Sequence, residues 1–276
     1  MNPDFQRGFI WQPDKQSKLI ESVLMRIPLP VFYLAEDEKG RMIVVDGLQR
    51  LSTFQNFVDN RLRLKLPDQK DLNGKIFDEL SPKLQNRVED CNLILYVIDV
   101  KVPEQAKLDI FERVNGGVPL TRQQMRNCLY MGRATTFLKQ QASTELFKKA
   151  TGHSLKASTM RDREFVNRFC AFQILPIKEY RGYMDDFLAK SLKIINSYQT
   201  EELETLSEQF QLTLRNNFKV FGDHAFRKHS KGQTKRNIIN ASLWDVMTTG
   251  LSRYPTELVE EKSTQLKSGF WKLMND

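Results

Sequence analysis

The spacing of apolar residues changes near residue 100, and this change restricts the folds open to the chain. Before it, β-branched and aromatic residues gather in three short runs, "VFYLA" at 31–35, "MIVVD" at 42–46 and "NLILYVIDV" at 92–100. Such runs are typical of strands, and the polar stretch "EDEKGR" between the first two predicts a hairpin. Beyond Val100 the apolar residues recur with the period of amphipathic helices.

Helices are predicted on both sides of this change. An apolar stripe over 15–27 ends at Pro28 and predicts a helix ahead of the hairpin. Thr121 and Gln124 have the spacing of a capping box, which predicts a helix start. The same reasoning predicts further helices over 48–58, 103–114, 158–175, 183–196, 200–221, 237–253 and 263–274.

These patterns predict an α+β fold. Residues 1–100 are expected to form a lobe with a small mixed sheet and helices, and residues 101–276 a larger, all-helical lobe packed against it. We expect the two lobes to form one compact unit, because no linker or low-complexity tract separates them. Two intimately packed lobes are the alternative.

Charge and composition indicate the class of partner. The formal net charge is +8 and the pI is near 9.3, which favours polyanions such as nucleotides and nucleic acids. No apolar run is long enough to cross a bilayer and the first residues have no leader pattern, so we expect a cytoplasmic protein without a membrane partner. Cys91, Cys128 and Cys170 are distant in sequence and surrounded by apolar residues, which predicts core packing.

The segment "VVDGLQR" at 44–50 has the pattern of a buried strand, a glycine turn and a helix start. A helix N-terminus binds anions, and Arg50 adds a forked donor that matches phosphate oxygens. Asp46 is a candidate ligand of Mg²⁺, and Gln49 a candidate to orient a phosphate or a water. The alternative is structural: Asp46 caps the helix and Arg50 pairs with a surface acid.

Two other segments could contribute to a nucleotide pocket. In "DFQRGFIWQP", Trp11 could stack on a base while Gln6 and Arg7 hold phosphate, although the same pattern fits a buried edge strand. In "IFERVNGGVPLT", Arg113 and Asn115 lie in a donor-rich loop that could complete a phosphate or sugar pocket. That loop is equally a good helix stop.

A basic segment at 227–236, "RKHSKGQTKR", contains no acid. It could follow a nucleic-acid backbone by charge alone, or it could be a solvated loop. Its cationic residues are Arg227, Lys228, Lys231, Lys235 and Arg236. The three histidines of the chain are not placed among acids as the ligands of a nuclease metal would be, so an autonomous nuclease ranks third among the possible functions.

The order of several segments resembles a known family. "FQRGFIW", "IPLPVFYL", "VVDGLQRLSTF", "LNGKIFDELSPKLQ", "FERVNGGVPLTRQQMRNCLY" and "YMDDFLAK" are similar to segments of the N-terminal domain family of GmrSD-type modification-dependent restriction systems. That family is recognised by a DGQQR-like motif and is related to the ParB and sulfiredoxin fold. The resemblance therefore implies a ParB-like N-terminal lobe.

The resemblance also implies a function. In the family the motif is associated with use of a nucleoside triphosphate, which assigns nucleotide binding to Asp46, Gly47, Gln49 and Arg50. The "QRG" and "ERVNGG" segments extend the same implication to Gln6, Arg7, Arg113 and Asn115. A nucleoside triphosphate and Mg²⁺ are thus the expected cofactors, and DNA and a separate nuclease or effector subunit the expected partners.

Three departures from the family pattern bear on this expectation. Leu48 stands where the family usually has Gln, so binding could survive while hydrolysis is impaired. The chain begins close to its first motif, and it stops short of the HNH-like nuclease region of the restriction systems. Our first hypothesis is a nucleoside triphosphatase of a prokaryotic anti-phage or restriction-type system, with Asp46, Gln49 and Arg50 as catalytic residues. The alternative is a non-enzymatic module that binds DNA or a partner protein.

Overall fold

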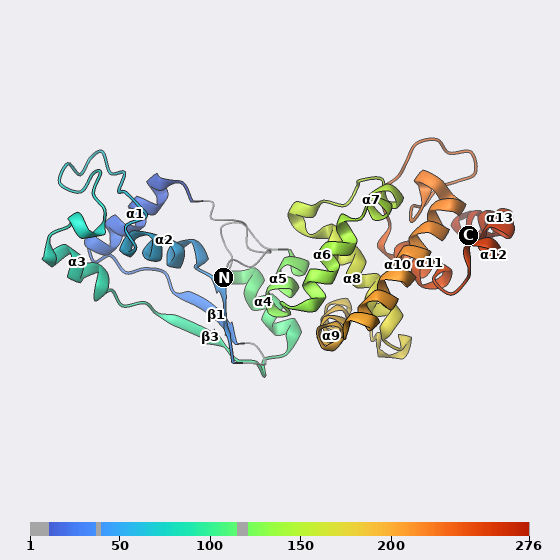
Figure 1. Cartoon of the computed structure of the whole chain (residues 1–276), viewed down its shortest axis with the longest axis horizontal. Helices are drawn as coiled ribbons and strands as arrows, with labels where there is room; N and C mark the ends of the chain where they lie inside the picture. The colour runs from blue at the N-terminus through green and yellow to red at the C-terminus, as the bar shows by residue number, and fades with distance from the viewer. Residues whose placement is uncertain (1–10, 37–39, 115–120, 276) are drawn as a thin grey trace. The chain divides into compact units, whose positions relative to one another are not determined.

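The computed structural model describes residues 11–36, 40–114 and 121–275. It divides into two compact units, Met1–Pro119 and Leu120–Asp276. The division falls later than residue 100, because helix α4 (Glu104–Val114) groups with the first unit. The elements can be followed along the colour gradient of Figure 1.

The first unit contains a three-stranded mixed sheet, as predicted. Strand β1 is central; it pairs antiparallel with β2 as a hairpin and parallel with β3. The parallel pair requires a crossover, and the chain supplies it through the helices between β2 and β3. The elements of the first unit before α4 are α1 (Pro13–Leu24), β1 (Phe32–Glu36), β2 (Met42–Asp46), α2 (Leu48–Val58), η1 (Phe77–Glu79), α3 (Pro82–Glu89) and β3 (Leu95–Ile98).

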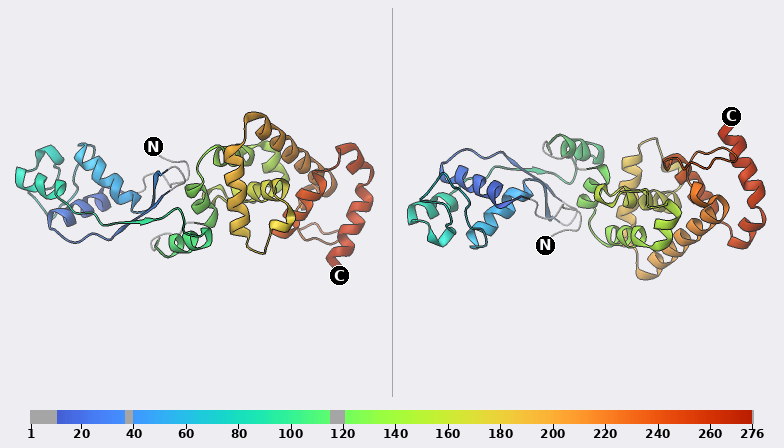
Figure 2. Two further views of the ribbon diagram at one scale, coloured as in Figure 1. Left: turned by 90° about the horizontal axis from the view of Figure 1, so that it is seen from below. Right: turned by 90° about the horizontal axis from the view of Figure 1, so that it is seen from above.

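Helix α1 organises the core of the first unit. It packs against α2 and α3, and the three helices can be followed in both views of Figure 2. Its buried face meets Phe57 of α2, which packs edge-on against Phe77. The buried residues of this core are Ile20, Val23, Leu24, Phe57, Leu62, Leu64, Leu66, Phe77, Leu80 and Val88. The turn after β2 is thereby placed at the N-terminal end of a helix whose other end is fixed in the core.

The second unit is helical in its described part. Thr121 caps α5 and forms the predicted capping box with Gln124. The predicted helices are present with small shifts of their ends, whereas α6, α7 and α12 were not predicted individually. The helices are α5 (Arg122–Leu129), α6 (Arg133–Ser143), α7 (Glu145–Thr151), α8 (Arg161–Ile174), α9 (Met184–Ser197), α10 (Thr200–Phe221), α11 (Ala241–Leu251), α12 (Thr256–Glu261) and α13 (Ser263–Asn275).

An aromatic cluster forms the centre of the second unit. Trp244 of α11 is fully buried and packs edge-on against Phe165 and Phe147. Cys128 and Cys170 are buried as predicted, and burial raises the pKa of both thiols; Cys91, in the first unit, is only partly buried. Across the described ranges, no helix combines the length and the apolar character that a membrane crossing requires.

Candidate functional site

The motif turn, residues 46–50, joins strand β2 to helix α2. β2 ends at Asp46, Gly47 has a φ of 101°, and α2 begins at Leu48. A Cβ atom on Gly47 would lie 2.4 Å from Cδ1 of the Phe32 ring. The turn therefore requires glycine for two reasons: the backbone has a positive φ, and position 47 lies too close to the Phe32 ring for a Cβ atom.

Arg50 points into the protein from the first turn of α2. Its Nη1 donates to the main-chain oxygen of Pro30, and its Nη2 donates to that of Val31 at 3.0 Å. Nη2 also donates to Oδ2 of Asp46 at 2.7 Å. The guanidinium lies over the Phe32 ring, 4.3 Å from its centroid, and only 11% of the side chain is exposed.

These contacts assign Arg50 a structural role in this conformation. Its hydrogen bonds link the start of α2 to Pro30 and Val31, which precede β1, and they hold the motif turn in its conformation. The predicted pairing of Arg50 with an acid is present, and the acid is Asp46 itself. The predicted helix cap by Asp46 is wrong, because the N-cap residue is Gly47 and no side chain caps α2.

The N-terminus of α2 is consequently electropositive. Its N-cap residue, Gly47, has no side chain that could accept a hydrogen bond, and its first turn contains no acid. Such a helix end favours anions through its dipole and its amide donors. Within the described residues no three or more His, Cys, Asp or Glu side chains are grouped to hold a metal ion. Mg²⁺ at Asp46 would therefore take its other ligands from phosphate oxygens and water.

Trp11 is the one residue of the N-terminal segment that both belongs to the predicted site and is described. Its main-chain amide donates to Oε1 of Gln49 at 3.1 Å, so the structure places Trp11 beside the motif turn. Lys15 Nζ lies over the Trp11 ring, 4.7 Å from the ring centroid. Because the Gln49 oxygen accepts this amide, Gln49 positions Trp11 in this conformation.

The remaining predicted nucleotide contacts divide into two groups. Gln6, Arg7 and Asn115 lie outside the described residues. Arg113 is exposed in the last turn of α4, a helix that packs against β2. A cavity of about 590 Å³ in the first unit lies at the C-terminal ends of α1 and α3, and its lining does not include the motif turn.

Comparison with known families identifies the first part of the chain. Residues 1–131 match the family model described as GmrSD restriction endonuclease, N-terminal domain. These residues belong to the GmrSD N-terminal domain family. Neither the search of curated proteins nor that of solved structures gave a match. The family places this part of the chain in a module of a restriction-type defence system.

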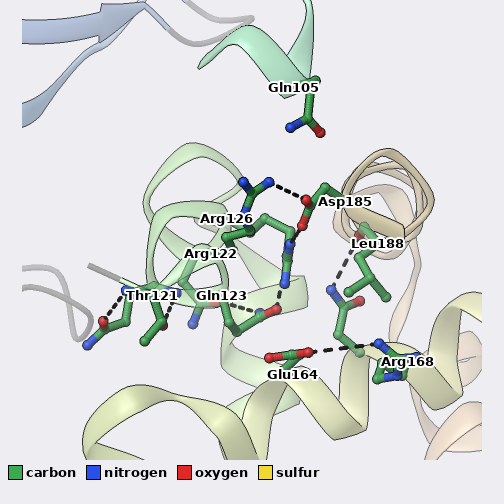
Figure 3. A network of polar contacts seen from close by, with 12 residues as sticks. Gln105, Thr121, Arg122, Gln123, Arg126, Glu164, Arg168, Asp185 and Leu188 are labelled. Carbon is green, nitrogen blue, oxygen red and sulfur yellow. Dashed lines mark hydrogen bonds and ion pairs between the residues drawn. The ribbon is translucent and has the colours of Figure 1, made fainter. Parts of the chain in front are cut away.

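The GmrSD N-terminal domain match extends beyond the first unit. It ends at residue 131, whereas the first unit ends at Pro119, so the match includes helix α5. Two arginines of α5, Arg122 and Arg126, both bind the carboxylate of Asp185 at the start of α9, as Figure 3 shows. Arg126 also donates from Nε to Oε1 of Gln123 at 3.0 Å.

Helix α8 adds two further arginines to this group. Arg161 Nη1 donates to both carboxylate oxygens of Glu164, at 3.2 and 3.1 Å. Arg168 lies 3.9 Å from Glu164 Oε1, and its Nε donates to Oδ1 of Asp245 at 2.8 Å. A cavity of about 370 Å³ lies among the four arginines. We call Arg122, Arg126, Arg161 and Arg168 with this cavity the arginine cavity.

Sequence reasoning did not find the arginine cavity. The available signal was the position of Arg126 on the buried face of α5, since a charged residue is almost never fully buried unless it is paired. Its partner Asp185 lies 59 residues along the chain, and no local pattern links the two.

The basic segment 227–236 is only partly a charged surface. Lys228, Lys231, Lys235 and Arg236 are exposed. Arg227 is fully buried: its Nη1 donates to Ala225 O at 2.8 Å and its Nη2 to Thr151 O at 2.6 Å. Burial lowers the pKa of Arg227 to about 10. Arg227 therefore holds the segment in place, and only the other four cations can face a ligand.

Proposed function

We propose that this chain is the nucleotide-responsive module of a restriction-type system, in which a nucleoside triphosphate with Mg²⁺ binds at the motif turn and is hydrolysed there. The state of the bound nucleotide then controls the action of a separate nuclease or effector subunit on foreign DNA. The observation that carries the proposal is the N-terminus of α2. It follows Asp46 after a single residue, Gly47, which offers no side-chain cap, and Arg50 holds the turn in shape.

Each residue of the turn has a distinct part in this proposal. The first amides of α2 face the phosphates, and Gly47 allows the backbone to approach them. Asp46 offers a carboxylate, 31% exposed, to Mg²⁺ while one of its oxygens stays bound to Arg50. Gln49 places Trp11 beside the turn, where an aromatic ring can stack on a base.

The match of residues 1–131 to the GmrSD N-terminal domain family supports the proposal, because that family indicates a module of a restriction-type system. Leu48 limits the chemistry at the turn. An apolar side chain cannot orient a water for attack, so this task falls to Gln49 or to Mg²⁺-bound water. We accordingly expect slow turnover.

Calorimetric titration of the full chain with ATP, GTP, CTP and UTP tests the proposal. Each titration is run with and without Mg²⁺, on the wild-type chain and on Asp46→Asn. The asparagine can still accept from Arg50 but carries no charge for a metal. We expect saturable binding of at least one triphosphate to the wild type, weakened roughly tenfold or more in Asp46→Asn when Mg²⁺ is present.

Asp59→Asn is the matched control, because Asp59 lies at the opposite end of α2 and pairs with an exposed arginine, Arg61. It should bind as the wild type does. Thermal unfolding of all variants reports whether they fold. Absence of binding by every triphosphate, or equal binding by folded Asp46→Asn and wild type, would contradict the proposal. Phosphate release by the wild type then tests hydrolysis.

A second candidate function is a module that binds DNA without hydrolysis. The observation that favours it is the group of four exposed cations in a segment without acids, at 228–236. Backbone contacts by these side chains would make binding salt-dependent and independent of sequence. Replacing Lys228, Lys231 and Lys235 by Gln should reduce the slope of log K against log salt. An unchanged slope would exclude this segment as the DNA contact.

A further inference from the structure

We propose that the arginine cavity of the second unit binds the phosphate group of a small phosphorylated ligand of mononucleotide size. This inference does not rest on the proposed site at the motif turn, since all residues that line the cavity belong to the second unit. Figure 3 shows Arg122, Arg126 and Arg168 with the carboxylates of Glu164 and Asp185.

Three helices begin at this cavity. Its lining includes Arg122, Arg161 and Met184, the first residues of α5, α8 and α9. Helix N-termini carry a partial positive charge and favour anions. The first turns of α8 and α9 also contain acids, among them Glu164 and Asp185, so the arginines rather than the helix dipoles provide most of the attraction for an anion.

Among the ionised side chains that line the cavity, guanidinium groups outnumber carboxylates. Four guanidinium groups line it, together with the carboxylates of Glu164 and Asp185. Asp245, which binds Arg168, is the third acid of the group and is not part of the lining. Each of the two lining carboxylates is shared between two arginines. The lining therefore offers several guanidinium donors to the oxygens of an anionic ligand.

Arg126 supplies the most specific evidence. Only 2% of its side chain is exposed, and it lines the cavity. Burial lowers its pKa, and the charge of Asp185 opposes this effect. Nη1 and Nε have partners, in Asp185 and Gln123. Among the described residues, Nη2 has none. Nη2 is not sealed from solvent, so water or a ligand oxygen can reach it, and a ligand oxygen would complete the hydrogen bonds of this guanidinium.

The rim of the cavity gives access and indicates the kind of ligand. Arg122 and Arg161 are 40% and 48% exposed, so a ligand can reach them from solvent. A guanidinium fork matches two phosphate oxygens. Met184 and Leu188 add apolar surface beside the arginines, against which a sugar or base can pack. A volume of about 370 Å³ suits a mononucleotide and excludes a duplex.

Calorimetry on the full chain tests this inference. The probes are pyrophosphate and AMP, titrated at constant ionic strength with EDTA present, into the wild type and into the double variant Arg122→Gln/Arg161→Gln. Both arginines are partly exposed, so the variant should fold. We expect saturable binding of one ligand per chain to the wild type and a loss of roughly tenfold or more in the double variant.

The matched control is Lys231→Gln/Lys235→Gln, which removes the same charge from exposed positions of the second unit. It should bind like the wild type, and Asp46→Asn, which alters the proposed site of the first unit, should do the same. The inference is overturned if neither probe binds, if the lysine control loses as much affinity as the arginine variant, or if only duplex DNA binds in the same assay.

Discussion

Arg50→Ala tests whether the arginine of the motif is a structural residue. The wild-type side chain donates to Pro30 O, to Val31 O and to Asp46, and it lies over the Phe32 ring. Alanine removes all four contacts. The carbonyls and the carboxylate that remain must then find water at a position where the arginine was 11% exposed.

The size of the effect follows from these contacts. A hydrogen bond that involves a charged group contributes about 1.5 kcal/mol or more, and a cation–π contact about 0.5–1 kcal/mol. The Asp46 side chain is 31% exposed, so water recovers most of the contribution of that pair. Two charged hydrogen bonds and the ring contact remain. We expect the free energy of unfolding of the first unit to fall by about 3–4 kcal/mol.

Hydrogen exchange measured by mass spectrometry is the suitable assay, because it resolves the first unit from the second by peptide. Arg50→Ala should lose protection in α1, α2 and β1, while peptides of α8 and α10 keep theirs. Arg61→Ala is the control: Arg61 is 58% exposed, and its pair with Asp59 should contribute less than about 1 kcal/mol. A change below about 1 kcal/mol for Arg50→Ala would refute the structural role.

Three further predictions concern other parts of the molecule. Gly47→Ala should destabilise the first unit by about 2–3 kcal/mol in chemical denaturation, because alanine is strained at a φ of 101° and its Cβ would clash with Phe32. Burial and the neighbouring His224 lower the pKa of His229 in the folded chain. The neutral imidazole therefore favours folding, and stability falls as the pH drops below the unfolded pKa of 6.5. Between pH 7.5 and pH 5.5 the Tm of His229→Gln should fall by less than the Tm of the wild type. Asp185→Asn should lower the stability of the second unit by about 3 kcal/mol and yet bind pyrophosphate more tightly, because it leaves two arginines without their carboxylate.

The sequence indicated elements well because the evidence for them is local. The hairpin of β1 and β2 follows from two β-branched runs about a polar turn, and the start of α5 from the capping box of Thr121 and Gln124. The strand, turn and helix of the motif follow in the same way, and the glycine that the turn requires is visible in the sequence.

Contacts that link distant segments were not predictable from such patterns. Arg50 donates to the main-chain carbonyls of Pro30 and Val31. Every residue has such a carbonyl, so the sequence does not indicate which ones accept from an arginine. The buried Arg227 stands in a run of exposed cations, and its acceptor Thr151 O is 76 residues away. The i,i+4 spacing of Asp46 and Arg50 was the one local sign that this arginine has an internal partner.

The charge balance at the two proposed sites leads to a last prediction, on metal dependence. At the motif turn Asp46 already neutralises the charge of Arg50. The positive charge that remains for a triphosphate is that of the α2 dipole, about half an elementary charge. Affinity there must come largely from Mg²⁺. The arginine cavity offers guanidinium donors directly to phosphate oxygens, so we expect binding there without a metal.

Titration of the wild-type chain with a triphosphate, first with Mg²⁺ and then with EDTA, separates the two sites. We expect two binding events with Mg²⁺ and one with EDTA, and the event that remains should be lost in Arg122→Gln/Arg161→Gln. Motif-turn binding that is unchanged by EDTA would show that a cation other than Mg²⁺ neutralises the phosphates. Because the arginine of the motif faces inward, that cation would have to come from a residue outside the turn.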